Sequence, residues 1–218
     1  MRHRPPKTRQ VPSYLRKIAA PSGDVAANFQ EALLLHQQGQ LQRAAELYER
    51  ILARQPTHSD SLHLLGVVAH QSGKPAVAVE LISRSIEINP SLAAAYNNRG
   101  LALNDLKRLD QALASLDKAI SLKPDYAEAY SNRGNALKDL KRLDEALASC
   151  DKAIALKPDF ADANFGKSYA LLLRGDMRQG LPLYEWRWKQ KDCESLRRGF
   201  SEPLWLGDAD LNGKTILL

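Results

Sequence analysis

Apolar and small residues return along the chain with two periods. Within segments of roughly 14 residues they recur every three or four positions, the spacing that places side chains on one face of an α-helix. Over a longer distance the whole pattern repeats every 34 residues, and its clearest markers are four prolines, Pro56, Pro90, Pro124 and Pro158. Proline cannot continue a helix and disfavours helical backbone in the residue before it, so each proline is expected to end a unit. The sequence therefore predicts stacked helical units rather than one globular core.

The two central units define the repeat. Residues 91–124 and 125–158 are identical at 25 of 34 positions. We take position 1 of each unit as Val25, Ser59, Ala93, Ala127 and Ala161, which places the units near 25–58, 59–92, 93–126, 127–160 and 161–191. In each unit the pattern predicts a first helix over roughly the first 14 positions, a short turn, and a second helix that ends just before the proline.

Small residues mark where the two helices of a unit meet. Position 8 holds Gly66, Gly100 and Gly134, and position 20 holds alanine in the same units. A glycine inside a helix costs about 1 kcal/mol relative to alanine, so its return at one position needs a structural reason. We interpret both positions as sites where the two helices approach each other closely.

These features resemble the tetratricopeptide repeat: small residues at positions 8 and 20, tyrosine at position 4 (Tyr96 and Tyr130) and proline at position 32. The resemblance covers about Asp24–Lys191. It implies an all-α fold, a right-handed superhelical solenoid of antiparallel helix pairs with about five repeats, in which the first helices line a concave groove. It also implies a non-catalytic scaffold that binds a protein or peptide in that groove.

The candidate binding residues come from helical geometry. Positions 2, 5, 6, 9, 12 and 13 cannot share the helix face that carries positions 4, 8 and 11, so they should line the groove. In the central units, the candidate peptide-binding residues are Asn97, Asn98, Asp105, Ser131, Asn132, Asn135, Lys138 and Asp139. Asparagine is a poor helix former, and its amide can bind a peptide backbone of any sequence. The alternative is that these are ordinary polar residues on a solvated face.

A variant of this groove that clamps a ligand carboxylate is less well supported. In related tetratricopeptide domains, asparagines at position 6, here Asn98 and Asn132, hold a peptide backbone or a carboxylate. The clamp adds lysines or arginines at groove positions of successive first helices, and only Lys138 fits. Arg99 and Arg133 occupy position 7, beside the core, where we expect a long side chain to extend past apolar neighbours to water.

Nothing in the sequence indicates catalysis, a metal or a cofactor. No phosphate-binding loop, nucleophile elbow or zinc-protease motif occurs, and the carboxylates recur with the repeat. Four of the five histidines lie in the first two units, and His36 and His70 share position 12, which places them on facing helices. They lack further ligands at a tight spacing, so we expect no metal site.

Charge and cysteine content narrow the class of protein. The net charge of +6 resides in residues 1–23, which carry six basic residues and no acid, whereas the remainder has 25 basic and 25 acidic residues. We therefore interpret 1–23 as a disordered basic arm, or as a short contact for a phosphate or acidic partner, and nucleic acid is not favoured as the main ligand. Two cysteines and no long apolar stretch favour a cytoplasmic protein without a membrane span.

The C-terminal segment departs from the repeat. It contains all three tryptophans, Trp186, Trp188 and Trp205, which we expect to cover the apolar end of the array or to form a surface for a partner or sugar. Residues 192–218 form a tail whose last five residues, Lys214–Leu218, predict a β-strand. The segment is similar to the junction between tetratricopeptide repeats and a heptosyltransferase-like domain in bacterial fusion proteins. This resemblance implies a fragment or accessory half of a glycosyltransferase; self-assembly through poorly capped ends is a third possibility.

Overall fold

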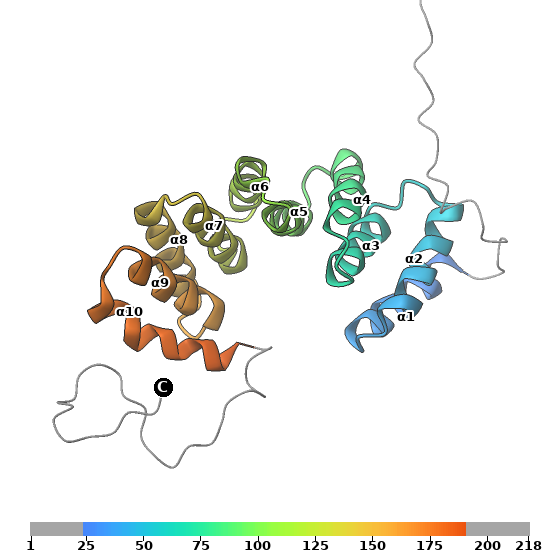
Figure 1. Cartoon of the computed structure of the whole chain (residues 1–218). Helices are drawn as coiled ribbons and strands as arrows, with labels where there is room; N and C mark the ends of the chain where they lie inside the picture. Colours follow the sequence, from blue (N-terminus) through green and yellow to red (C-terminus); the bar gives the residue numbers. More distant parts are fainter. Residues whose placement is uncertain (1–23, 191–218) are drawn as a thin grey trace, which may run out of the picture. The chain divides into compact units, whose positions relative to one another are not determined.

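The computed structural model describes residues 24–190 of the 218. Every regular element in this range is helical (Figure 1). The helices are α1 (Val25–Gln37), α2 (Leu41–Arg54), α3 (Ser59–Gln71), α4 (Pro75–Ile88), α5 (Ala93–Asp105), α6 (Leu109–Leu122), α7 (Ala127–Asp139), α8 (Leu143–Leu156), α9 (Ala161–Leu173), α10 (Met177–Tyr184) and the 3₁₀ helix η2 (Glu185–Lys189). The basic arm, Cys193, Trp205 and the expected strand at Lys214–Leu218 lie outside the described residues.

The chain divides into two compact units, Met1–Pro90 and Ser91–Leu218. Unit 1 contains α1–α4 and unit 2 contains α5–α10 with η2. Within each unit, consecutive helices pack as antiparallel pairs, and the second helix of one pair packs against the first helix of the next: α2 on α3 in unit 1, α6 on α7 and α8 on α9 in unit 2. The predicted all-helical array of repeated helix pairs is confirmed.

The prolines end the second helices as predicted. Helices α2, α4, α6 and α8 each stop two residues before Pro56, Pro90, Pro124 and Pro158. Helix starts have their own signals. The side chain of Asp24 accepts a hydrogen bond from the Ala26 backbone N–H, and Pro75 occupies the first turn of α4, where a missing N–H is harmless.

The turn inside each pair depends on one left-handed residue at position 15. Three pairs place glycine there, Gly39, Gly73 and Gly175, with φ between 72° and 89°. The two central pairs instead use Lys107 (φ 58°) and Lys141 (φ 63°). Left-handed backbone is readily adopted by glycine and costs other residues roughly 1 kcal/mol, so the packing around these two lysines must enforce the turn.

The close approach predicted at positions 8 and 20 is confirmed. A Cβ atom added to Gly134 would lie 2.7 Å from Cys150 Sγ and 3.3 Å from the Ala146 carbonyl oxygen. The corresponding atom on Gly100 would lie 2.6 Å from Leu116. In these two pairs position 8 therefore has room only for glycine, because the facing helix lies too close for a side chain. Cys150 itself is buried, as expected, and burial raises the pKa of its thiol to about 12.

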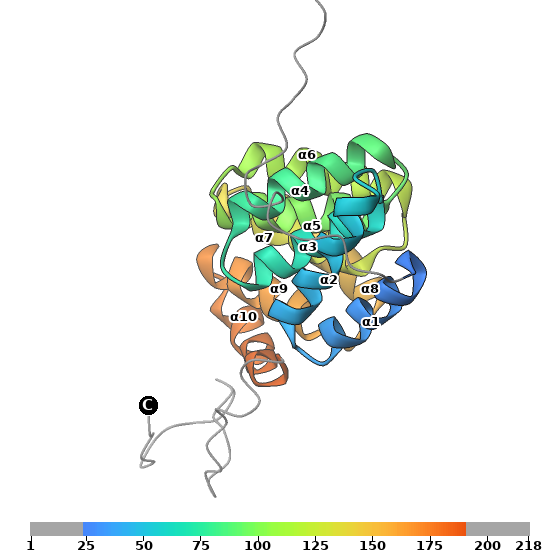
Figure 2. The same cartoon turned by 90° about the vertical axis from the view of Figure 1, so that its right-hand side faces the viewer.

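The fifth pair, α9–α10, differs from the others. Helices α9 and α10 lie side by side (Figure 1 and Figure 2), but α10 has 8 residues where each earlier second helix has 14. Pro182 lies within α10 and has no N–H for the helix ladder, and the chain continues as the tighter helix η2. Trp186 and Trp188 therefore lie on a 3₁₀ helix that packs against α9.

Candidate functional site

The candidate site is the face of unit 2 formed by α5, α7 and α9. These three first helices are neighbours, because α7 contacts both α5 and α9. We call the surface made by their positions 2, 5, 6, 9, 12 and 13 the groove face. All eight binding residues predicted from the sequence lie on α5 or α7, so unit 2 contains the whole predicted set.

Amide side chains link α5 to α7 across this face. We define the amide row as Asn97, Asn98, Asn132 and Asn135. Asn132 Nδ2 donates a 2.9 Å hydrogen bond to Asn97 Oδ1, and Asn97 Nδ2 donates one of 3.2 Å to Asn98 Oδ1. Asn97 is only 5% exposed, whereas Asn98 and Asn132 are half-buried. Buried Asn97 therefore fixes the orientation of the two partly exposed amides at position 6, Asn98 and Asn132, by one hydrogen bond to each.

The row continues toward α9. Asn135, at position 9, is half-buried, and its Oδ1 would lie 3.4 Å from a Cβ atom placed on Gly166. Gly166 occupies position 6 of α9, where α5 and α7 carry asparagine. The glycine thus leaves space beside the Asn135 amide. Ser131, also a predicted site residue, is 2% exposed and is a packing residue.

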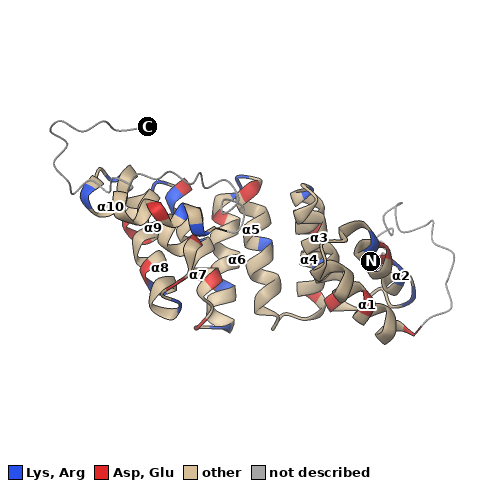
Figure 3. Cartoon of the chain, turned by 90° about the horizontal axis from the view of Figure 1, so that it is seen from below, with Lys and Arg blue, Asp and Glu red and all other residues tan. Residues whose placement is uncertain are grey.

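Charged residues gather at the end of the groove face where the first helices terminate. Asp139 Oδ2 accepts a 2.8 Å hydrogen bond from Lys107 Nζ, and Asp139 Oδ1 lies 3.8 Å from Lys138 Nζ. The hydrogen bond to Asp139 raises the pKa of Lys107. Asp105, the equivalent of Asp139 on α5, is exposed. Residues of both signs are interspersed over the helices of unit 2 (Figure 3), and on the groove face itself Lys138 lies beside Asp139.

Aromatic residues of α9 complete the face, and sequence reasoning missed them. Lys138 Nζ lies 4.9 Å from the ring centroid of Tyr169, a cation–π contact, and Tyr169 is 43% exposed. The ring of Phe165 lies 6.2 Å from that of Tyr169 and 5.6 Å from that of Tyr184. Phe165 and Tyr169 occupy positions 5 and 9, so applying the same groove positions to the fifth unit would have found both.

The chain itself covers part of α9. Gln190 Nε2 donates a 2.9 Å hydrogen bond to Asp162 Oδ1 at position 2, and η2 packs against α9. Within η2, the guanidinium of Arg187 lies over Tyr184 and Trp188, and Lys189 lies over Trp186. The open part of the groove face is therefore limited to α5, α7 and the Tyr169 side of α9.

The position-7 arginines behave differently from the expectation. Arg99 Nε donates to Ser115 Oγ at 3.0 Å, and Arg133 NH1 donates to Ser149 Oγ at 2.7 Å. Arg133 Nε also bonds to Asp117 at 2.6 Å. These side chains do not simply extend to water, because serine at position 23 of the second helix offers a buried acceptor. They hold helices together behind the groove face.

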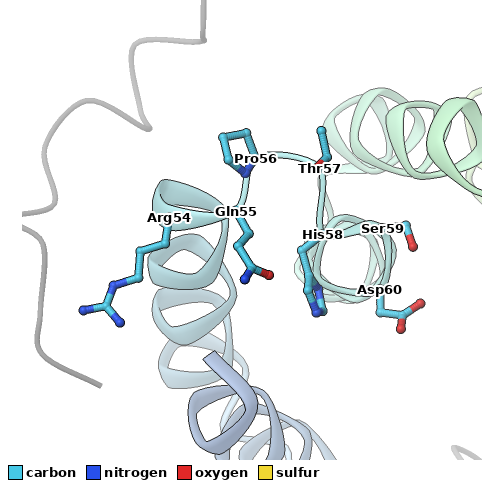
Figure 4. Close-up of a pocket in the computed structure, with 7 residues that line it drawn as sticks. All are labelled: Arg54, Gln55, Pro56, Thr57, His58, Ser59 and Asp60. Carbon is cyan, nitrogen blue, oxygen red and sulfur yellow. The ribbon is translucent and has the colours of Figure 1, made fainter. Parts of the chain in front are cut away.

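The loop between α2 and α3 in unit 1 differs from the groove face. A hollow in the loop between α2 and α3 is lined by seven consecutive residues, 54–60, all of them polar except Pro56 (Figure 4). His58, one of them, already accepts a hydrogen bond from the Ser61 N–H through Nδ1. His36 lies 3.0 Å from the Gln71 amide oxygen. Among residues 24–190, no three His, Cys, Asp or Glu side chains are placed to hold a metal ion.

Comparison with known proteins agrees with this architecture. The family models "TPR repeat" and "Tetratricopeptide repeat" match residues 100–141 and 127–160, and the model of anaphase-promoting complex subunit 3 matches residues 23–119. The chain therefore contains tetratricopeptide repeats. These matches do not reach the C-terminal segment, so its similarity to a glycosyltransferase junction stays a prediction.

Solved structures show the same fold. The tetratricopeptide protein TTC0263 of Thermus thermophilus is 24% identical, with a TM-score of 0.66 over 78% of this chain and 92% of its own. MamA of Desulfovibrio magneticus is 19% identical, with a TM-score of 0.64 over 80% and 98% of the two chains. PilF of Pseudomonas aeruginosa is 21% identical, with a TM-score of 0.66 over 74% of each chain. No curated protein matches the sequence significantly. None of the described helices has the length and apolar character needed to cross a membrane.

Proposed function

We propose that the chain is a non-catalytic interaction scaffold that binds an extended peptide or protein segment along the groove face of unit 2. The observation that carries this proposal is the amide row, in which buried Asn97 holds Asn132 and Asn98 in fixed positions. A row of oriented amides can donate to and accept from successive peptide groups of an extended chain. Because the amides are already positioned, a ligand would order few side chains on binding.

The neighbours of the row suit such a ligand. Tyr169 presents a partly exposed aromatic surface with Lys138 stacked on it, which can take an apolar ligand side chain and an acidic group close together. Asp105 on α5 is exposed and can receive a basic group. The face thus combines sequence-independent backbone recognition with a few side-chain contacts for specificity.

A scaffold fits these residues better than an enzyme. The hydroxyl and thiol nearest the face are buried: Ser131 is 2% exposed and Cys150 is 1% exposed. The raised pKa of Cys150 keeps it as an inert thiol. The small number of cysteines supports the further proposal of a cytoplasmic protein.

The test begins with selection of peptide ligands for the full chain from a displayed library, followed by measurement of Kd by calorimetry. The double variant Asn98→Ala/Asn135→Ala removes two amides from the groove face. We expect it to raise Kd at least tenfold, since each tenfold step corresponds to about 1.4 kcal/mol. The matched control is Gln111→Ala/Lys118→Ala, which changes two exposed polar residues of α6. An unchanged Kd for the amide variant, or equal losses in both, would contradict groove binding.

A second candidate function rests on the sequence of residues 183–218, which is similar to the junction of a glycosyltransferase fusion. Under this proposal the repeats select the acceptor for a separate catalytic domain. The DNA that follows the codon of Leu218 tests it. An in-frame or adjacent glycosyltransferase-like reading frame supports the accessory role, and its absence removes the candidate.

A further inference from the structure

The first helix of the chain exposes a face that later first helices bury. Helices α3, α7 and α9 each pack on the preceding helix pair of the same unit. Their residues at positions 3 and 10 are at most 3% exposed; they are Ser61, Val68, Ala129, Ala136, Ala163 and Ala170. In α1 the same positions hold Ala27, which is exposed, and Leu34, which is 57% exposed. Among residues 24–190, nothing fills at α1 the contact that these positions make in α3, α7 and α9.

The last second helix exposes the complementary face. Position 21 holds Leu113 in α6 and Leu147 in α8, each 7% exposed where the next first helix packs. In α10 the residue at this position is Leu181, which is 37% exposed. Met177, one turn earlier at position 17, is 55% exposed. The described chain thus presents one half of the repeat-to-repeat contact at α1 and the other half at α10.

We propose that copies of this chain associate head to tail, with α1 of one copy packed on α10 of another in the manner in which α9 packs on α8. The argument is continuity with an interface that the fold already uses, since both exposed surfaces belong to the same repeated contact. Such an interface is heterologous, because different surfaces of the two copies meet. It involves α1 and α10, which carry none of the predicted peptide-binding residues.

Charge opposes this contact at one position. Inside unit 2, the cation at position 7 pairs with the aspartate at position 25 of the preceding pair: Arg133 with Asp117, and Lys167 with Asp151, both at 2.6 Å. At the joint, position 7 is Glu31 and position 25 is Glu185. Glu185 pairs with Arg187 through Oε1, while its Oε2 is buried with no hydrogen-bond partner among the described residues. The like charges of Glu31 and Glu185 weaken the contact between α1 and α10, so we expect association only at high protein concentration.

The experiment is sedimentation of the full chain over a wide concentration range, with three variants. Leu34→Glu blocks only the α1 face and Leu181→Glu blocks only the α10 face. Each variant alone should remain monomeric where the wild type associates, and an equimolar mixture should form dimers and no larger species, because one intact face of each kind remains. Glu31→Gln should strengthen association at least threefold, because it removes one of the two like charges at the contact.

Other results would overturn the proposal. A wild type that stays monomeric at all concentrations, as expected if another part of the chain covers either face, rules it out. So does self-association of either single variant at the wild-type level, which indicates an interface elsewhere or one made by two identical faces. Circular dichroism checks that the variants fold. If either glutamate variant unfolds, the single variants Leu34→Gln and Leu181→Gln are used in place of Leu34→Glu and Leu181→Glu.

Discussion

The fourth and fifth helix pairs lie next to each other in unit 2 and reach the same close packing with different residues. In α7–α8 the first helix carries Gly134 at position 8 and the second carries Ala146 at position 20. In α9–α10 the order is reversed, with Ser168 at position 8 and Gly180 at position 20. Ser168 Oγ is buried and donates a 2.9 Å hydrogen bond to the Gly180 carbonyl oxygen. The requirement is thus a small summed volume at the crossing, and no single glycine position is essential to it.

The two pairs also differ on the groove face. The fourth pair offers Asn132 and Asn135 at positions 6 and 9, and the fifth offers Gly166 and Tyr169. An amide surface therefore changes to a small residue beside an aromatic one within a single repeat. This change marks where the amide row ends and the aromatic contact of Lys138 with Tyr169 begins.

The strongest test of the packing comparison is Gly134→Val. The added side chain meets Cys150 Sγ and the Ala146 carbonyl, and the backbone oxygen cannot move without disturbing α8. We expect unit 2 to lose about 3 kcal/mol of unfolding free energy, the upper range for overpacking a core. Urea unfolding followed by circular dichroism measures the loss. A change below about 0.5 kcal/mol would show that the crossing tolerates volume and that the comparison is wrong.

A smaller effect is expected for Ser168→Ala in the fifth pair. The variant keeps the small volume but removes the buried hydrogen bond to Gly180. We expect a loss of about 1 kcal/mol, the usual net value of one such bond. Tryptophan fluorescence during urea unfolding is a suitable probe, because Trp186 and Trp188 lie on η2 beside α9. If Ser168→Ala were as stable as the wild type, the hydroxyl would contribute nothing beyond its size.

The smallest expected effect has the opposite sign. A Cβ atom on Gly166 would meet Asn135 Oδ1 at 3.4 Å and Cys150 Sγ at 3.5 Å, which are ordinary contacts. Gly166→Ala should therefore gain about 0.5 to 1 kcal/mol from helix propensity. The same urea experiment compares it directly with Gly134→Val. A destabilised Gly166→Ala would mean that the space beside Asn135 is tighter than these distances imply.

Much of the fold could be predicted from local sequence. Pro124 and Pro158 predicted where the second helices end, and Gly100 and Gly134 predicted where the two helices of a pair cross closely. Both features depend only on residues within one repeat. The division after Pro90 could not be predicted, since it depends on long-range packing and the repeat continues through it without a break. The left-handed backbone at Lys107 and Lys141 could not be predicted either, because lysine has no preference for a positive φ.

The candidate site was predicted only in outline. Helical periodicity correctly placed Asn98, Asn132 and Asn135 on neighbouring first helices. It did not show that Asn97 is buried and supports Asn132, or that Lys138 stacks on Tyr169, because both contacts cross between repeats. Partnering of Arg133 with Ser149 and Asp117 was missed for the same reason: the acceptors lie on two different second helices.

The measurement that tests peptide binding most directly is nuclear magnetic resonance of the asparagine side-chain amides during titration with a selected peptide. Groove binding predicts that the NH₂ signals of Asn98, Asn132 and Asn135 shift together and saturate at one Kd, while Gln111 on α6 and Gln42 on α2 stay unchanged. The account would be contradicted if these three amide signals did not move when the protein is saturated with peptide. Shifts confined to the second helices or to unit 1 would contradict it equally.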